Sequence, residues 1–340
     1  MLRVALLTRG APAAVSGGHL YHRQMAAAAA DHGAEITFGV ERLGRRLPAG
    51  TDVVVLDSIA AWRMAPAMLL RRRRSPSIVA MVHQVPGGVD TPAVRRRVQR
   101  ALDRFVYRRC DVVLAASTTL AEALVAEHGL DPDRVDLVEP GCDLPIATTA
   151  GALRQGRRLA VLVVANWLPN KGLLAVLEAV AGLDADDVTL HLTGRDDVDP
   201  TYTARVRERL AAPDLDGRVV VHGTVDPPTV AGLYAGADVF VLASDVEAYA
   251  TVAAEALAAG VPVLGWRRPF LERLVTDGVE GRLLPPGDVT ALREAVRDLA
   301  HDEPTRRAMA AAALRRGATL PTWADTAAVF FTALRRRSVG

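Results

Sequence analysis

Lysine is almost absent from this chain, and the position of the single exception suggests an anion-binding site. Among 41 Lys and Arg residues only Lys171 is a lysine, and it shares a six-residue window with both asparagines, Asn166 and Asn170. Lys171 follows the apolar run 159–165 and opens a predicted helix. The helix dipole favours anions at that position, so a lysine there adds nothing to helix stability. An anionic partner such as a diphosphate explains the lysine better; the alternative is an exposed side chain of the first turn.

Two adjacent glycines, Gly17 and Gly18, form a second candidate for anion binding. They close a loop after the first apolar run and precede a predicted helix over 20–31. Glycines at a helix start let backbone N–H groups approach an anionic ligand, and the helix dipole adds attraction. The spacing matches neither the dinucleotide-binding nor the Walker phosphate-binding pattern, so a plain turn is an equally good interpretation.

Two acidic residues, Glu247 and Glu255, could hold the hydroxyl groups of an extended ligand. On one helix an offset of eight residues returns to nearly the same face, about 12 Å further along. The spacing therefore predicts two carboxylates directed at the two ends of one ligand. Alone it is a weak signal, because many surface helices carry glutamates this far apart.

Two series of apolar runs, alternating with helical segments, must position these residues. The first series is 2–7, 36–40, 53–56, 78–82, 112–115 and 135–138, and the second is 159–165, 188–193, 219–221, 239–242 and 261–264. Near-continuous apolar strands that alternate with helices indicate parallel sheets covered on both faces. We therefore predict an α/β fold of two doubly wound, Rossmann-like domains. Because such sheets bind ligands at the carboxyl ends of their strands, the expected site is a cleft that the two domains face.

The expected domains are 1–146 and 159–320, followed by a mostly helical segment over 321–340. Between the domains, 147–158 is a predicted linker, because Thr, Ala, Gly and Arg replace the periodic pattern there.

Composition excludes several classes of protein. An apolar fraction of 50% is ample for a folded core, and a net charge of +2 argues against a dedicated nucleic-acid binder. Cys110 and Cys142 are too few for a disulfide framework or a Cys-rich zinc site. No apolar run approaches the ~20 residues of a membrane span, and the first run is too short for a signal peptide. A cytoplasmic protein is the expectation.

Longer motifs resemble a known family. The stretch 244–288 reads Ser-x-x-Glu, seven residues, Glu-Ala-Leu-Ala-x-Gly-Val-Pro-Val, then Glu272, Asp277-Gly278, Gly281 and Pro286-Gly287-Asp288. Further segments stand in the matching order: Ser16-Gly17-Gly18, His83, Pro169-Asn170-Lys171-Gly172 and Trp323. Together they resemble the retaining glycosyltransferases of family four, which have the GT-B fold. The resemblance covers nearly the whole chain, and the order and spacing of the motifs make it specific.

The resemblance implies transfer of a sugar from a nucleotide-diphosphate sugar, with UDP or GDP as the expected nucleotide, to an acceptor hydroxyl with retained anomeric configuration. The implied contacts are Lys171, Gly17 and Gly18 to the diphosphate, Glu255 to the ribose, and His83 to the donor sugar near the reacting carbon. The donor sugar would also be held by Glu247 and by the backbone of Ala248, Tyr249, Ala250 and Thr251. No metal or further cofactor is implied, because lysine and helix N-termini supply the positive charge. The helix that contains Trp323 would pack back on the first domain.

The chain departs from the family pattern near these residues. Asn166 is a candidate residue for binding the nucleotide. It stands where the family usually has an arginine, so the positive charge that would accompany Lys171 is missing. We expect Arg268, or its neighbour Arg267, to supply that charge. Two alanines replace the glycines of the usual Glu-Gly-Phe-Gly segment, which narrows the allowed backbone conformations at 248 and 250. Elsewhere, 197–199 imitates a metal-binding Asp-x-Asp pair but falls in a predicted surface loop.

Arginines are concentrated in two segments, 71–74 and 94–109. The second carries seven arginines against one acid, Asp103, with apolar residues on its other side. Such a basic amphipathic helix can bind an anionic membrane surface, although a solvated helix face with snorkelling arginines is the simpler interpretation. The acceptor is therefore open between a small molecule, a natural product and a lipid headgroup, with peripheral contact to the inner face of the membrane in the last case.

Two other functions share the expected architecture. One is a nucleotide-sugar epimerase or a phosphorylase of the same fold. The other is a sugar-nucleotide-binding protein without turnover, which would accommodate the changes at Asn166 and Ala250. A dehydrogenase fits less well, because the glycine spacing differs from the dinucleotide-binding pattern.

Overall fold

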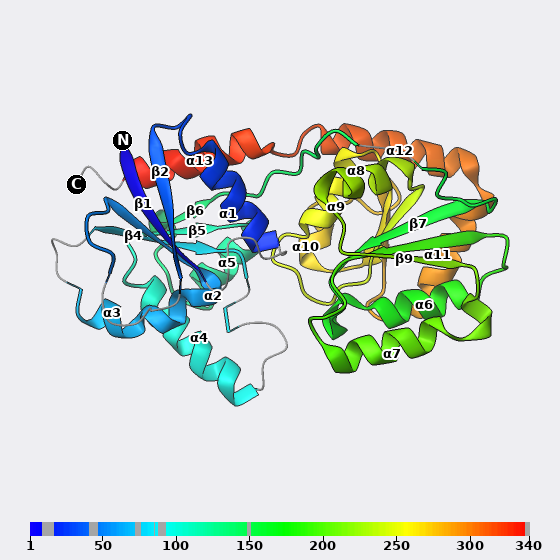
Figure 1. The fold of residues 1–340 in the computed structure, drawn as a ribbon, viewed down its shortest axis with the longest axis horizontal. Helices are drawn as coiled ribbons and strands as arrows, with labels where there is room; N and C mark the ends of the chain where they lie inside the picture. Colours follow the sequence, from blue (N-terminus) through cyan, green and yellow to red (C-terminus); the bar gives the residue numbers. More distant parts are fainter. Residues whose placement is uncertain are drawn as a thin grey trace. The chain divides into compact units, whose positions relative to one another are not determined.

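The computed structural model describes residues 1–8, 17–40, 47–71, 76–84, 86–87, 93–147 and 151–336. The chain divides into two units. Unit 1 comprises Met1–Gly141, Glu247–Tyr249 and Pro321–Gly340, and unit 2 comprises Cys142–Val246 and Ala250–Leu320. Each unit is built on a six-stranded sheet in which the strands pair in parallel, which confirms the predicted α/β fold (Figure 1).

The sheet of unit 1 has the strand order β2-β1-β3-β4-β5-β6. Its strands are β1 (Leu2–Thr8), β2 (Ala34–Val40), β3 (Val53–Asp57), β4 (Ser77–Val82), β5 (Val112–Ala115) and β6 (Val135–Leu137). The helical segments of the unit are α1 (Gly17–Ala28), α2 (Ser58–Ala61), η1 (Trp62–Met64), α3 (Ala65–Leu69), α4 (Ala93–Tyr107), α5 (Thr118–Ala126), η2 (Pro132–Arg134) and α13 (Trp323–Arg336).

Strands buried on both faces explain why the sequence shows near-continuous apolar runs in unit 1. Successive side chains of a strand point to opposite faces, and the strands of this sheet divide accordingly. In β1, Val4 and Leu6 belong to the cluster formed with α1 and α13. Ala5 and Leu7 belong to the cluster formed with α3, α4 and α5. Helices therefore cover both faces, as parallel sheets require.

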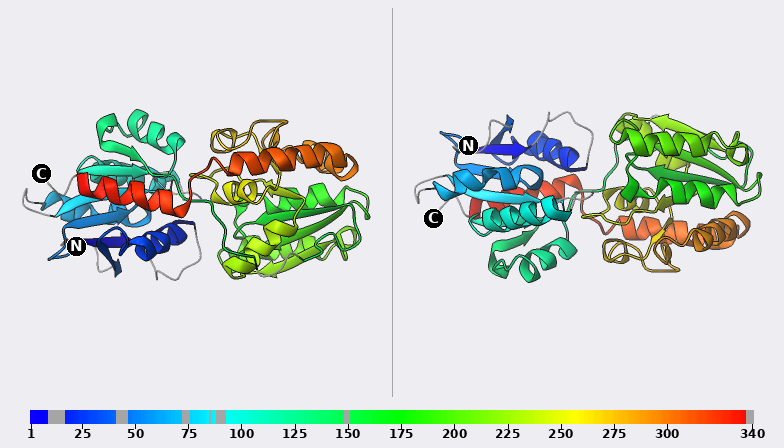
Figure 2. Two further views of the ribbon diagram at one scale, coloured as in Figure 1. Left: turned by 90° about the horizontal axis from the view of Figure 1, so that it is seen from above. Right: turned by 90° about the horizontal axis from the view of Figure 1, so that it is seen from below.

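The C-terminal helix α13 is part of the core of unit 1 and runs along its sheet (Figure 2). Phe330 and Phe331 are fully buried and lie edge to face, with ring centroids 5.2 Å apart. The hydroxyl of Thr326 donates to the carbonyl of Glu139 at 2.8 Å, which fixes the start of the helix to the segment after β6. A segment almost two hundred residues away in sequence thus completes one face of this sheet.

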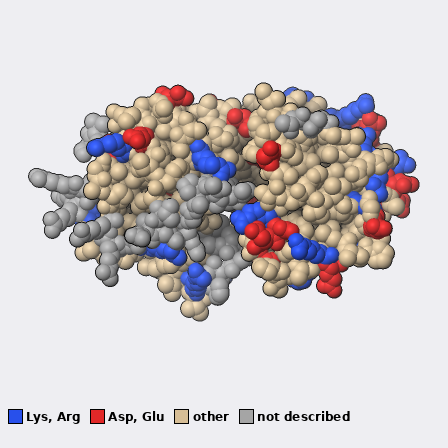
Figure 3. All heavy atoms as spheres, viewed as in Figure 1, with Lys and Arg blue, Asp and Glu red and all other residues tan. Residues whose placement is uncertain are grey.

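Helix α4 presents a basic surface. Its arginines 95, 96, 97, 100 and 104 are all exposed, and arginine side chains are visible along it (Figure 3). Its single acid, Asp103, is buried and accepts a hydrogen bond from the N–H of Gly87 at 3.1 Å. The exposed side of α4 therefore carries positive charge and no negative charge. The predicted cluster 71–74 lies outside the described residues except for Arg71, which pairs with Asp111 at 2.5 Å.

The sheet of unit 2 has the order β12-β11-β10-β7-β8-β9. Its strands are β7 (Leu159–Val164), β8 (Val188–Thr193), β9 (Val219–Gly223), β10 (Val239–Leu242), β11 (Val263–Trp266) and β12 (Gly281–Leu284). The helical segments are η3 (Pro169–Lys171), α6 (Leu173–Ala181), α7 (Pro200–Leu210), η4 (Pro213–Leu215), α8 (Pro227–Gly236), α9 (Thr251–Ala258), α10 (Pro269–Glu272), α11 (Val289–His301) and α12 (Glu303–Gly317).

Aspartate side chains fix where four helices of unit 2 begin. Each is an N-cap whose carboxylate accepts from the backbone N–H three residues further on, and the four are Asp199, Asp226, Asp288 and Asp302. Such a cap satisfies an N–H group that has no partner within the helix. The segment 151–158 packs on this unit as well, because Arg154 forms two hydrogen bonds with Asp238, at 2.5 and 2.8 Å. Among the described residues, none of the helices combines the length and the apolar character that a membrane span requires.

The burial of α13 predicts how two neighbouring substitutions differ in stability. Phe331→Ala removes a fully buried ring and is expected to lower the free energy of unfolding by about 3–5 kcal/mol. The control Val329→Ala lies on the same helix but is 43% exposed, so it should change that free energy by less than about 0.5 kcal/mol. Urea denaturation measures both, and equal losses would contradict the packing of α13 in the core.

Candidate active site

Lys171 lies at the carboxyl end of β7, in a turn that packs against the loop after β10. It ends the short helix η3, and the next residue, Gly172, has a left-handed conformation with φ of 67°. A Cβ atom at this glycine would lie 2.2 Å from the carbonyl oxygen of Ala243. The N–H of Asp245 also donates to the carbonyl of Asn170 at 2.9 Å. The two loops therefore hold the lysine turn in one place.

Arg268 joins the same group of loops from the end of β11. One of its terminal nitrogens lies 2.7 Å from Oδ1 of Asp245. Strands β7, β10 and β11 are neighbours in the sheet, so the loops that follow them meet at one edge. Asp245 thus connects Arg268 to the Lys171 turn, because its side chain contacts Arg268 and its N–H donates to Asn170. Its neighbour Arg267 points to a different partner and pairs with Asp277.

Asn166 connects the loop after β7 with the loop after β8. Its side-chain oxygen accepts from the N–H of Arg195 at 3.1 Å, and the N–H of Trp167 donates to the carbonyl of Arg195 at 2.7 Å. The asparagine therefore holds a turn together. The two aspartates of the Asp-x-Asp segment also make local contacts. Asp197 pairs with the Arg195 guanidinium at 2.9 Å, and Asp199 is the N-cap of α7.

Glu255 lies on α9 beside a buried tyrosine. The hydroxyl of Tyr234 is 3.1 Å from Oε2 of Glu255 and 2.9 Å from the carbonyl oxygen of Val252. Burial raises the pKa of Glu255 to about 7, although the tyrosine hydroxyl stabilises the carboxylate and acts in the opposite direction. This carboxyl group consequently changes charge close to neutral pH.

The prediction that Glu247 and Glu255 share one helix is wrong. Helix α9 begins at Thr251, and the preceding Ala250 has a left-handed backbone with φ of 67°. The chain turns there, so Glu247 lies outside the helix. The segment Glu247–Tyr249 belongs to unit 1, whereas Ala250, Thr251 and Glu255 belong to unit 2. The left-handed conformation also explains why a glycine is the usual residue at position 250, since a side chain there costs about 1–2 kcal/mol.

In unit 1, Gly18 and His83 are in direct contact. Gly17 and Gly18 are the first residues of α1, and His83 follows β4 directly. A Cβ atom at Gly18 would lie 2.4 Å from Cε1 of the His83 ring. The glycine therefore leaves room for an imidazole as well as giving access to backbone N–H groups. Ser16, the first residue of the predicted glycine motif, lies outside the described residues.

His83 is paired with a buried aspartate at the end of β3. Its Nε2 lies 2.8 Å from Oδ1 of Asp57. Burial disfavours the charged imidazole, but the Asp57 carboxylate outweighs this effect and raises the pKa of His83 above its ordinary value. The carboxylate in turn is expensive to bury, yet His83 and His22 hold the pKa of Asp57 well below its ordinary value.

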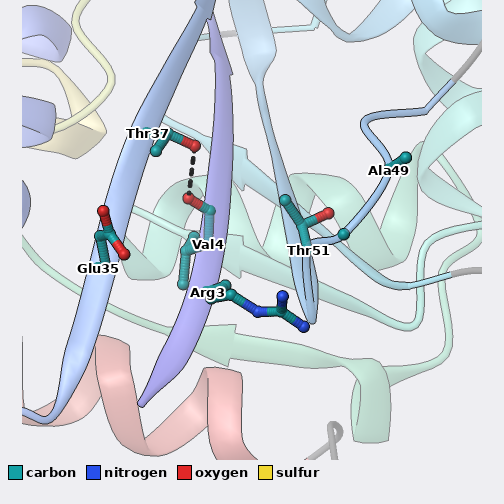
Figure 4. Close-up of a pocket in the computed structure, with 7 residues that line it drawn as sticks. Arg3, Val4, Glu35, Thr37, Ala49 and Thr51 are labelled. Carbon is teal, nitrogen blue, oxygen red and sulfur yellow. Dashed lines mark hydrogen bonds between the residues drawn. The ribbon is translucent and has the colours of Figure 1, made fainter.

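A shallow pocket of unit 1 lies at the amino-terminal edge of the sheet, whereas His83 lies at the carboxyl-terminal edge. Its volume is about 230 Å³, and it is lined by Arg3, Val4, Glu35, Thr37, Ala49, Gly50 and Thr51 (Figure 4). These residues stand at the amino ends of β1, β2 and β3, opposite Gly18 and His83. Open parallel sheets bind their ligands at the carboxyl ends, so we do not assign this pocket to the candidate site.

Two family profiles match the chain, and together they cover most of it. "Glycosyltransferase Family 4" matches residues 3–145, and "Glycosyl transferases group 1" matches residues 150–316. The chain belongs to glycosyltransferase family four. The resemblance inferred from the motifs is thereby confirmed.

Curated relatives of this family-four chain include enzymes with two different names. D-inositol 3-phosphate glycosyltransferase of Xylanimonas cellulosilytica is 32% identical over 265 residues, which cover 73% of this chain and 63% of the relative. Mannosylfructose-phosphate synthase of Agrobacterium fabrum is 26% identical over 208 residues, which cover 57% of this chain and 45% of the relative. The chain thus spans about half to two thirds of the length of these curated relatives.

Solved structures share the fold over the full chain. Sucrose-phosphate synthase of Thermosynechococcus elongatus superposes with a TM-score of 0.83 at 20% identity, covering 99% of both chains. Anabaena HepE in complex with UDP and glucose gives 0.81 at 18% identity, covering 99% of this chain and 100% of that one. The GT-B fold expected from the resemblance is therefore confirmed.

Sequence reasoning did not predict Asp57, His22 or Arg195 as part of these clusters. The signal for Asp57 was present, because it is a polar residue directly after the apolar run 53–56, at the carboxyl end of a strand. Arg195 also stands beyond the carboxyl end of a strand, two residues after β8. No local motif marks His22, which joins the cluster only through packing of α1.

The contact between the loops after β7 and β10 predicts different costs for two glycine substitutions. Gly172 and Gly287 both have positive φ, of 67° and 76°. A Cβ atom at Gly287 meets nothing within 4 Å, so Gly287→Ala should cost only the backbone strain of about 1–2 kcal/mol. Gly172→Ala should lose a further ~1–3 kcal/mol because the loop after β10 must move. Urea denaturation measures both, and equal losses would show that the two loops do not pack together.

Proposed function

We propose that this family-four chain is a retaining glycosyltransferase that moves a sugar from a nucleotide-diphosphate sugar to a hydroxyl group of an acceptor. The observation that carries the proposal is the position of Lys171. The single lysine of the chain ends the turn after β7, and the loops after β10 and β11 are hydrogen-bonded around that turn. A lysine on a turn that is held in this way, at the carboxyl edge of a parallel sheet, is well placed for an anionic ligand.

In unit 2 the proposed roles concern the nucleotide. Lys171 binds the diphosphate and stabilises its charge as the glycosidic bond breaks, and Arg268 contributes a second positive charge. Glu255 accepts hydrogen bonds from the ribose hydroxyls. Asn166 acts indirectly, because its contact with Arg195 fixes the turn that precedes the lysine.

The remaining roles concern the donor sugar. His83 contacts the sugar near the reacting carbon, and the backbone N–H groups of Gly17 and Gly18 offer positive ends of dipoles to an anionic group. Glu247 and the backbone of Ala248, Tyr249, Ala250 and Thr251 hold the sugar hydroxyls. The leaving diphosphate assists attack by the acceptor on the same face of the sugar, which retains the anomeric configuration. Lysine and helix N-termini supply the positive charge, so the proposal needs no metal ion.

UDP is the nucleotide that we propose first. HepE, which has the same fold, forms a complex with UDP and glucose, and GDP is the alternative. The names of the curated relatives suggest polar acceptors that carry phosphate, such as D-inositol 3-phosphate. A small phosphorylated acceptor with a free hydroxyl is therefore the first class to test.

Nucleotide binding is expected to depend on Lys171. UDP at a hundredfold excess over its dissociation constant should stabilise the wild-type chain by about 2.7 kcal/mol, visible as a rise in melting temperature. Lys171→Ala loses a charge-assisted contact worth about 1.5–3 kcal/mol and should weaken UDP roughly 10- to 100-fold. Arg268→Ala should also weaken UDP. If Arg268→Ala binds UDP like the wild type, Arg268 is not the second cation.

Arg158 provides a matched control for Lys171. It is the residue before β7, at the opposite end of the same strand, and its side chain is 57% exposed beside Asp187. Arg158→Ala should bind UDP as the wild type does. No stabilisation by any nucleoside diphosphate would contradict the proposal. Binding of UDP without its release from UDP-glucose in the presence of acceptors would instead indicate a binding protein that lacks turnover.

A lipid acceptor is a second candidate, favoured by the exposed surface of α4. Val94 and Val98 on this helix are 76% and 56% exposed, next to arginines 95, 96 and 97. Apolar side chains flanked by arginines, with no exposed acid on the helix, suit the surface of an anionic membrane. We therefore propose peripheral membrane contact through α4 if the acceptor is a lipid headgroup.

Vesicle binding tests this second candidate. The wild-type chain should sediment with phosphatidylglycerol vesicles and not with phosphatidylcholine vesicles, and added salt should release it. Replacing Arg95, Arg96 and Arg97 by Ser should weaken binding about 100-fold, at about 1 kcal/mol for each arginine. The same change at the exposed Arg205, Arg207 and Arg315 should have no effect. Equal binding by both triple variants would show that α4 is an ordinary solvated helix.

A further inference from the structure

The carboxylate of Asp57 is the centre of a buried cluster in unit 1. We use the name Asp57 cluster for Asp57, His22 and His83. Oδ1 of Asp57 lies 2.8 Å from Nε2 of His83 and accepts from the N–H of Ile59 at 3.0 Å. Oδ2 lies 2.9 Å from Nε2 of His22 and also accepts from the hydroxyl of Thr8. The Asp57 side chain is only 1% exposed, so these donors replace water completely.

This set of contacts favours an ionised carboxylate. Each oxygen of Asp57 has at least two partners. In addition to the contacts already described, Oδ1 lies 3.4 Å from the hydroxyl of Ser58. A protonated carboxyl would have fewer acceptor positions for Thr8, Ser58 and Ile59 and would need an unprotonated ring nitrogen as its own acceptor. Hydrogen bonds to the charged form favour that form. The negative charge of Asp57 is therefore built into the core of unit 1.

A buried negative charge needs a positive partner, and the two imidazoles differ in their suitability. Burial is the largest effect on both rings. For His83 the carboxylate outweighs burial, and its pKa is raised. For His22 burial prevails and its pKa is lowered, with the neighbouring His83 and His19 acting in the same direction. His83 is also the more exposed of the two rings, with 9% of its side chain accessible against 2% for His22. The cluster is therefore an Asp57 carboxylate with a His83 imidazolium and a neutral His22.

Gly18 fixes how the His83 ring is oriented. A Cβ atom at Gly18 would lie 2.4 Å from Cε1, 2.8 Å from Nδ1 and 2.9 Å from Nε2 of the ring. The edge of the imidazole that carries both nitrogens therefore packs under the first turn of α1. Since Nε2 is committed to Asp57, the second N–H of the imidazolium is at Nδ1. Ring position and proton positions are both determined by the surrounding residues.

We propose that Asp57 is a positioning residue that holds His83 as an oriented imidazolium, with neutral His22 as the second donor to the same carboxylate. His83 then serves the transfer reaction as a fixed positive charge and hydrogen-bond donor, and not as a proton acceptor. The role of His83 toward the donor sugar rests on the proposed function, whereas the charge state of the Asp57 cluster does not.

The same three side chains have the spacing of a metal-binding group, because their ligand atoms lie within 4.8 Å of one another. Hydrogen bonds account for this spacing. The two Nε2 atoms are 3.3 Å apart, and each is within 3 Å of a different oxygen of Asp57. A metal ion would compete with Thr8 and Ile59, which already donate to this carboxylate. The experiments below therefore include a measurement of zinc binding, which distinguishes a metal site from the hydrogen-bonded cluster.

The first experiment needs no donor or acceptor. The ¹⁵N spectra of the histidine rings are recorded on the full chain at increasing pH, and the His83 signals are identified with His83→Gln. Above the ordinary imidazole pKa of 6.5, both ring nitrogens of His83 should still be protonated in the wild type. A neutral His83 ring at that pH would overturn the proposal, whatever any variant does.

Asp57→Asn provides the matched change. An amide keeps the shape of the side chain but not its charge, so burial should take the pKa of His83 below 6.5 and the ring should lose its proton at lower pH. His22→Gln retains a donor to Asp57 and should leave His83 charged. The control is Asp52→Asn, at the opposite end of β3, where the carboxylate pairs with Arg3 on the surface. The other titratable groups that act on the cluster are His19 of α1 and Tyr107 of α4, and all these variants retain them.

The second experiment measures release of UDP from UDP-glucose. Asp57→Asn should lower kcat roughly 10- to 100-fold, which is the scale of one lost charge-assisted hydrogen bond, with KM nearly unchanged. In the wild type kcat should fall as pH rises through the raised pKa of His83, and in Asp57→Asn this fall should occur at lower pH. Asp52→Asn should match the wild type. An unshifted pH profile in Asp57→Asn would overturn the proposal.

The outcomes separate the possible failures. If the wild type releases no UDP, the proposed function is contradicted, while the ring spectra still decide the state of His83. One equivalent of zinc, bound by the wild type and lost in both Asp57→Asn and His22→Gln, would replace the imidazolium by a metal site and overturn the proposal.

Discussion

Parallel pairing of the strands is the constraint on which both groups of candidate residues depend. In a parallel sheet the chain leaves every strand at the same edge, so neighbouring strands deliver their following loops to one place. In unit 2, β7, β10 and β11 are neighbours and bring together the Lys171 turn, Asp245 and Arg268. In unit 1, β1, β3 and β4 are neighbours and bring together Thr8, Asp57 and His83. These residues are far apart in the sequence, but they lie close together in space because their strands are neighbours in the sheet.

The two groups use charge differently. In unit 2 the charged side chains near Lys171 are partly exposed, as in the pair of Arg268 and Asp245, whose side chains are 34% and 56% exposed. Pairs of this kind exchange readily with water and with ligands, because solvent screens them. In unit 1 the charged side chain of Asp57 is buried in the core, where removal of one of its partners would lower the stability of the fold. The ion pair beside Lys171 is therefore open to solvent, whereas the Asp57 carboxylate is shielded from it.

The elements and the lysine turn could be predicted from sequence because their signals are local. Apolar runs mark strands that are buried on both faces, and Lys171 stood out by composition and by its place before a helix. The run that became β12 was missed, since Gly281 and Arg282 interrupt its apolar character and it has only four residues. The spacing of Glu247 and Glu255 predicts one helix, because nothing in the sequence marks Ala250 as left-handed. The Asp57 cluster could be predicted only in part. Asp57 and His83 stand at the carboxyl ends of two strands, whereas His22 joins them through the packing of α1, which no local motif marks.

The place of α13 in the core of unit 1 also affects the order in which the chain can fold. The strands of unit 1 precede unit 2 in the sequence, yet one face of their sheet is covered by Phe330, Phe331 and Leu334, which are synthesised after unit 2. Chains generally fold domain by domain as they leave the ribosome. Here the sheet made first must keep an apolar face uncovered while nearly the whole of unit 2 is produced. Unit 2 is therefore the first that can close its own core, and unit 1 can finish folding only after α13 has been synthesised.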